Sequence, residues 1–158
     1  MNIPGRTLLA AATLAIWACG APDPLLSFLD EESGLSLTHP PRWTIGSAEQ
    51  AGVRYRYLTA PKVGDDKEAL SVTLIAPVPA ASAEAVATAY LSGAFGVVMT
   101  PGPGGAATWT FKDQAGISST LRVAPAGQGR YIGASARGSD AAMKHYQGRV
   151  SGILNSLR

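Results

Sequence analysis

Short stretches in which apolar and polar side chains alternate recur along this chain, and they restrict its fold more than any other feature. Residues 35–39, 53–59 and 69–75 alternate in this way, which is the pattern of a strand with one face buried and one face in water. The chain also has 18 Gly and 11 Pro, residues that favour turns. We therefore expect strands joined by turns rather than a bundle of long helices.

Further segments extend this pattern. Residues 107–112, 117–124 and 129–136 have strand-like composition and are separated by short turn sequences, which is typical of consecutive hairpins. Residues 82–95 and 139–157 instead carry apolar side chains at three- and four-residue steps, which predicts amphipathic helices. This order of strands, helix, strands and helix predicts one domain of the α+β class, an antiparallel sheet flanked by helices.

The strand at residues 53–59 is expected to have one buried face and one wet face. By alternation, Val53, Tyr55 and Tyr57 share the face that we expect to be buried, and Arg54 and Arg56 point toward water.

Two other parts of the chain have weaker signals. Residues 25–29 are expected to form a helical turn, and the Pro- and Gly-rich residues 100–105 an exposed loop. Large aromatic side chains are usually mostly buried, so Trp43, Trp109 and Phe111 are expected in the core.

The N-terminal segment has the parts of an export signal. Arg6 precedes an apolar run at residues 8–18, and Cys19, the only cysteine of the chain, follows at once. A membrane-crossing helix needs about 20 apolar residues, so this run is too short to span and suits a cleaved signal peptide. With one cysteine, an intramolecular disulfide is excluded.

The motif Ile16-Trp17-Ala18-Cys19 resembles the lipobox of bacterial lipoprotein precursors. The resemblance implies that residues 1–18 are a signal peptide, and that Cys19 carries fatty chains such as palmitate. Each buried methylene contributes about 0.8 kcal/mol, so two or three chains suffice as an anchor. Residues 19–26 would then be the lipidated cysteine and its tether, and residues 27–158 the globular domain.

The alternative at this motif is an ordinary secretory signal that is cut near Ala18 or Ala21 and leaves Cys19 without lipid. The lipoprotein resemblance also implies an address. Gly20 follows the cysteine, where inner-membrane lipoproteins of Gram-negative bacteria often carry Asp. The expected location is therefore the cell envelope, facing the periplasm or the exterior, with the outer membrane favoured in a Gram-negative cell.

A second resemblance covers the domain. The segment at residues 33–43, a glycine-led strand running into prolines and Trp43, together with the closing residues 153–157, is similar to PsbP-like domains. This resemblance implies an α-β-α sandwich. That fold serves extrinsic proteins of photosystem II, a nuclear transport factor that binds a small GTPase, and many bacterial lipoproteins, so it does not by itself fix a function.

The sequence offers few groups for catalysis. His39 and His145 are isolated and expected at the surface or in capping positions, and residues 65–68 lack the spacing of a calcium loop. Residues 102–105 lack the Lys-Ser/Thr of a phosphate loop, and no Gly-x-Ser-x-Gly elbow is present. We expect no enzyme, no cofactor and no metal site. The net charge is +2 and the basic residues are scattered, so nucleic acid is not an expected partner.

These observations favour a lipid-anchored, non-enzymatic accessory or binding module of the cell envelope, with a protein partner in the envelope. An alternative is an envelope enzyme or small-ligand carrier with a pocket between the sheet and a helix, lined by Tyr55, Tyr57 and Trp109. A third hypothesis is a purely structural spacer.

Overall fold

The computed structural model describes residues 24–50 and 52–158. Two helices are present there, α1 (Ala83–Tyr90) and α2 (Asp140–Ser156), with one short 3-10 helix, η1 (Pro103–Gly105). The strands are β1 (Leu26–Asp30), β2 (Leu35–His39), β3 (Thr44–Gln50), β4 (Val53–Thr59), β5 (Ser71–Pro79), β6 (Phe95–Pro101), β7 (Ala107–Lys112), β8 (Ser118–Gly127) and β9 (Arg130–Gly138).

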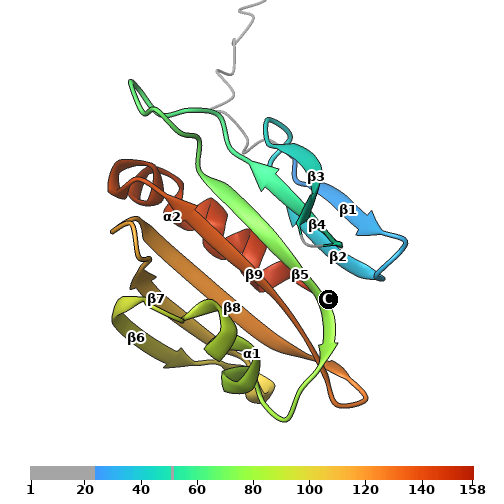
Figure 1. Cartoon of the computed structure of the whole chain (residues 1–158). Coiled ribbons are helices and arrows are strands. Elements are labelled where there is room, and N and C mark those ends of the chain that lie inside the picture. Colours follow the sequence, from blue (N-terminus) through green and yellow to red (C-terminus); the bar gives the residue numbers. More distant parts are fainter. Residues whose placement is uncertain (1–23, 51) are drawn as a thin grey trace, which may run out of the picture.

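The strands form two antiparallel sheets. β1 and β2 make a hairpin, and the other seven strands make one sheet in the order β3-β4-β5-β9-β8-β7-β6. α1 and α2 lie on opposite faces of this large sheet (Figure 1). The expected α+β class, with an antiparallel sheet between helices, is therefore confirmed.

The larger core fills the space between the sheet, α2 and the β1–β2 hairpin. The side chains of α2 that enter it recur at three- and four-residue steps, as the sequence predicts, and a fully buried Val, Leu or Ile contributes about 1.5–3 kcal/mol. Trp43 also lies in this core, 3% exposed, with its ring edge-to-face against Tyr146 at 5.4 Å. Its main members are Leu35, Leu37, Trp43, Leu58, Val72, Leu74, Ile132, Ala134, Tyr146, Val150, Ile153 and Leu154.

A smaller core lies on the other face, beneath α1. Strand alternation supplies it, because Leu74 enters the larger core and the next residue, Ile75, enters the smaller one. Trp109 and Phe111 are buried here, as expected. The other buried members are Ala83, Val86, Ala87, Ala107, Leu121 and Val123.

Some local predictions were wrong. Residues 25–29 do not form a helical turn, because Leu26–Asp30 pairs with β2 as strand β1. The first helix ends at Tyr90 rather than near residue 95, and Gly93 follows it with a left-handed φ of 73°. His39, expected at the surface or in a capping position, is only 5% exposed, and its Nδ1 donates to the Pro40 carbonyl at 2.9 Å.

The faces of β4 are also the reverse of the expectation. Leu58 is fully buried, and by alternation it shares its face with Arg54 and Arg56, whereas Val53 is 65% exposed and Tyr57 only half-buried. The physical reason is the β1–β2 hairpin, which covers the arginine face and supplies carboxylates for those arginines. Sequence alternation alone does not indicate that cover.

Candidate functional site

The large sheet has an opening between β4 and β5. The two strands pair only at three positions, from Tyr57 opposite Thr73 to Thr59 opposite Ser71. Beyond that point residues 53–56 of β4 and residues 74–79 of β5 diverge, and a cavity of about 410 Å³ lies between them. We call it the β4–β5 cleft.

The shape of β5 explains why the strands separate. Its pairing with β9 shifts register between Ile75 and Val78, which marks a bulge, and a bulge bends its strand. Pro77 lies within this bulge and has no N–H to donate to a neighbouring strand. The Pro77 carbonyl accepts instead from Arg130 Nη2 at 2.9 Å. β5 therefore follows β9 and turns away from β4.

Ion pairs hold the other wall. Arg56 Nε lies 3.0 Å from Asp30 Oδ1, at the end of β1, and Arg54 lies 3.5 Å from Glu32 in the β1–β2 turn. A hydrogen bond from Ser33 Oγ, at 2.5 Å, and the Arg56 guanidinium keep the pKa of Asp30 below its usual value. The Asp30 carboxylate therefore stays charged and ties β4 to the hairpin.

The cleft has an apolar floor and a mixed rim. Leu35 and Leu74, both from the larger core, lie at its floor. Tyr55 from β4 and Tyr90 from the end of α1 line it, together with Arg130. Burial raises the pKa of Tyr90, so its hydroxyl is a neutral donor at physiological pH. The arrangement can hold an elongated ligand that has apolar groups and hydrogen-bonding groups.

The structure does not bring the three candidate binding residues together. Tyr55 lines the β4–β5 cleft. The ring of Tyr57 packs over Gly46, where an added Cβ would lie 2.5 Å from the ring. Trp109 is 4% exposed in the smaller core, on β7, and three strands lie between β7 and β4 in the sheet. A pocket lined by all three is therefore absent from the part of the chain that the structure describes.

Sequence reasoning missed the residues that shape the cleft. Sequence alternation places Arg54 and Arg56 toward water and gives no role to Asp30 and Glu32. One signal was available in the sequence. The two acidic residues are two positions apart and so are the two arginines, which fits two ion pairs side by side. Arg130 had no signal, because its contact with Pro77 depends on the bulge in β5.

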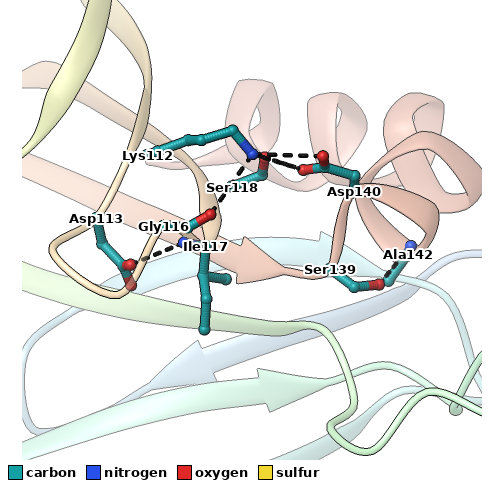
Figure 2. A network of polar contacts seen from close by, with 8 residues as sticks. All are labelled: Lys112, Asp113, Gly116, Ile117, Ser118, Ser139, Asp140 and Ala142. Atoms are coloured by element: carbon teal, nitrogen blue, oxygen red, sulfur yellow. Dashed lines mark hydrogen bonds and ion pairs between the residues drawn. The ribbon is translucent and has the colours of Figure 1, made fainter.

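A second polar cluster joins the β7–β8 turn to the start of α2. Figure 2 shows Lys112 reaching the Gly116 carbonyl, the Ser118 hydroxyl and the Asp140 carboxylate, which is 3.0 Å from Nζ. A hydrogen bond from Ser118 and the Lys112 ammonium lower the pKa of Asp140. Every charge drawn in this cluster has a partner within the chain, so it serves to fasten the elements.

Asp113 closes the same turn. Its carboxylate accepts from the amides of Ala115 and Ile117, both at 2.9 Å, and from Arg137 Nε at 2.7 Å. The Arg137 guanidinium and the Ile117 amide lower the pKa of Asp113. The side chain therefore fixes the hairpin turn and binds it to β9.

Other expectations concern metals and membranes. Among residues 24–50 and 52–158, no group of three or more His, Cys, Asp or Glu side chains is placed to hold a metal ion. Neither described helix is long and apolar enough to cross a membrane. The motif Ile16, Trp17, Ala18 and Cys19 lies outside the described residues.

The fold and the cleft define an α+β protein of PsbP-like architecture. The structure is similar to the solution structure of cyanobacterial PsbP (CyanoP) from Synechocystis sp. PCC 6803, with a TM-score of 0.55. The similarity covers 89% of this chain and 95% of that chain at 14% sequence identity, so it concerns the fold. The sequence itself matches no protein-family model and no curated protein.

Proposed function

We propose that this chain is a lipid-anchored accessory protein of the cell envelope, which binds an extended segment of a partner protein in the β4–β5 cleft and catalyses no reaction. The observation that carries this proposal is the pair of diverging strands. Among the described residues, no strand pairs with residues 53–56 of β4 on the cleft side, and a cavity of about 410 Å³ lies there. The accessory role is proposed because the sequence has an expected anchor and few groups for catalysis.

An extended segment matches this cleft chemically. Free N–H and C=O groups at a strand edge accept a further strand, and each main-chain hydrogen bond contributes about 1 kcal/mol net. β4 would provide this ladder, while Leu35 and Leu74 at the floor and Val78 of β5 provide apolar contacts. Tyr55 and Tyr90 would donate from the rim. The segment expected to bind has apolar side chains on one face.

Photocrosslinking in the native envelope tests the cleft. A photoreactive amino acid in place of Tyr55 is expected to give a discrete adduct with one envelope protein. The matched control is the same amino acid in place of Ser151, which is exposed on α2 and remote from the cleft lining. Adducts that are the same from both positions, or only the uncrosslinked chain from both, would refute the cleft as a binding site.

The small-ligand carrier of the alternative hypothesis gives a different result. A carrier would show no protein adduct at Tyr55 but would change the Tyr fluorescence of the purified chain on addition of envelope extract freed of protein. The proposal predicts that such an extract leaves the fluorescence unchanged.

The anchor is tested separately. Replacement of Cys19 by Ser is expected to move the chain from the membrane pellet to the soluble fraction after an alkaline wash, because the fatty chains are the attachment. Labelling with radioactive palmitate should disappear in the same variant. If Cys19→Ser stays in the pellet as fully as the unaltered chain, the anchor proposal fails, while the cleft proposal remains open to its own test.

A further inference from the structure

β6 is an edge strand that carries no charged side chain, with a bulge between Phe95 and Val98 and a proline, Pro101, at its end. It ends the seven-strand order and pairs only with β7 within the described residues. All seven of its residues are exposed. Phe95 is 52% exposed, Val98 60% and Met99 47%. A row of open main-chain groups beside large apolar side chains is a template for another strand.

No residue of β6 itself is charged, and the nearby charges lie at its Phe95 end, where Lys112 is in register with Phe95 and Lys144 lines the same hollow. From Ala85 to Phe111 the sequence has no Asp, Glu, Lys, Arg or His. Proteins usually protect an exposed edge with a charged side chain, often Lys. The opposite edge of the same sheet, β3, has such a residue in Glu49. The absence of charge at β6 is therefore a local property of this edge.

The apolar side chains of β6 lie on both faces of the sheet. Met99 is in register with Trp109 and so lies on the α1 face, whereas Val98 is in register with Thr110 on the α2 face. Phe95 also lines a hollow on the α2 side with Met143. A molecule that binds this edge has to cover apolar side chains on both faces of the sheet. It also has to form hydrogen bonds with the open N–H and C=O groups of β6.

A strand meets all of these requirements, and a lipid surface does not. Hydrocarbon offers no hydrogen-bond partners, so an open sheet edge is not stable in it. A strand provides N–H and C=O groups in the plane of the sheet and side chains above and below it. The occupant is therefore polypeptide.

We propose that this strand is the β6 of a second copy, so that two chains form a two-fold dimer with one continuous sheet through antiparallel β6 strands. A two-fold interface places the same patch against itself, and charged residues there would repel unless each met an opposite charge. The residues of β6 carry no charge and so have no such penalty. Antiparallel pairing also needs no crossover connection.

Sedimentation equilibrium of the full chain in a density-matched non-ionic detergent tests the dimer. The unaltered chain is expected to have the mass of two chains, and Val98→Lys the mass of one at the same concentration, with dimerisation weakened at least about tenfold, or about 1.4 kcal/mol. The control is Leu29→Lys on β1, where the residue is 59% exposed, close to the exposure of Val98. The control is expected to remain a dimer.

Amide hydrogen exchange gives a measurement that needs no variant. The amides of residues 96–100 should exchange more slowly as the concentration of the unaltered chain rises, and those of β3, at the opposite edge, should not change. A monomer at every concentration, equal masses for Val98→Lys and Leu29→Lys, or protection that is independent of concentration would overturn the proposal. None of these results would affect the cleft, which is on another part of the sheet.

Discussion

Gly133 lies in β9, in the middle of the large sheet, and leaves no room for a side chain. A Cβ at this position would be 2.7 Å from the Arg122 carbonyl oxygen and 3.1 Å from Ile75 Cδ1. The Arg122 carbonyl oxygen belongs to the backbone of the paired strand β8. The clash can therefore be relieved only if the backbones of β8 and β9 move apart. Gly133→Ala should therefore lower the free energy of unfolding by about 2 kcal/mol, measured by urea denaturation.

Gly148 is the matched control on α2. Nothing lies within 4 Å of a Cβ built there, and Ala is favoured over Gly in a helix interior by about 0.8–1.0 kcal/mol. Gly148→Ala should therefore raise the free energy of unfolding. Equal effects of the two substitutions would show that the space around Gly133 is not the determining factor.

Asp30 should make the stability depend on pH. Its pKa is lowered from 3.8 by the Ser33 hydrogen bond and by Arg56, so the folded state binds its proton less tightly than the unfolded state does. The stabilisation is then complete well above pH 3.8 and is lost as the pH falls through the lower pKa of the folded state. Asp30→Asn should be less stable than the unaltered chain at pH 7, and this difference should shrink below pH 4.

The control for this titration is Asp65→Asn. Asp65 is exposed, and among the described residues it makes no side-chain hydrogen bond or ion pair. Its substitution should leave the urea midpoint unchanged at both pH values. A difference between Asp30→Asn and the unaltered chain that is constant from pH 7 to pH 3 would contradict the role of the charge.

At the scale of elements, α2 depends for two contacts on Ser139, the residue that caps its N-terminus. The Ser139 hydroxyl accepts from the Ala142 amide at 3.0 Å, which caps the helix, and donates to Asp66 at 2.7 Å. Ser139→Ala should cost about 1–2 kcal/mol in the free energy of unfolding, because an N-cap and a second hydrogen bond are lost together.

Ser151→Ala provides the comparison within the same helix. Ser151 is exposed in the middle of α2, where Ala is the better helix former. Its free energy of unfolding should be unchanged or slightly higher, as measured by thermal denaturation. A loss as large as that of Ser139→Ala would exclude the cap as the cause.

The elements that sequence predicted well are those whose pattern comes from one buried face. β2, β7, β8 and α2 fall where the alternation or the three- and four-residue steps place them. Each of these elements packs one face against a core, so its apolar residues recur in the sequence with the period of a strand or a helix. The α+β class follows from their order.

The elements that sequence missed lack this one-sided burial. Many residues of β1 and β3 and all residues of β6 are exposed. Their sequences therefore show neither the two-residue alternation of a strand nor the three- and four-residue steps of a helix. The cleft was missed for another reason. It depends on a bulge in β5 and on ion pairs between β4 and the β1–β2 hairpin, which are contacts between distant segments. Of the three expected binding residues, Tyr55 lines the cleft, and its role in binding stays a prediction.

At the scale of the whole molecule, one sheet serves two cores, and we expect them to unfold together. Trp43 reports on the larger core and Trp109 on the smaller one. In Trp43→Phe and in Trp109→Phe, the fluorescence of the remaining core tryptophan should follow the same urea transition as far-UV circular dichroism. The reason is that β5 contributes to both cores through Leu74 and Ile75.

The two variants together decide this point. Separate transitions, with fluorescence of Trp109 lost before circular dichroism, would mean that the α1 side melts on its own. In the mature chain expected from the lipobox, residues 19–158, Trp43 and Trp109 are the two tryptophans, so each variant keeps one.

The sheet that joins the two cores also separates them. Because alternate side chains of a central strand enter different interiors, an enlarged residue on one side has no direct contact with the packing on the other, and distant substitutions combine additively. Substitutions in one core can therefore be compensated within that core, without changes in the other. A wall of this kind lets the side chains of either interior change while the topology of the sheet persists.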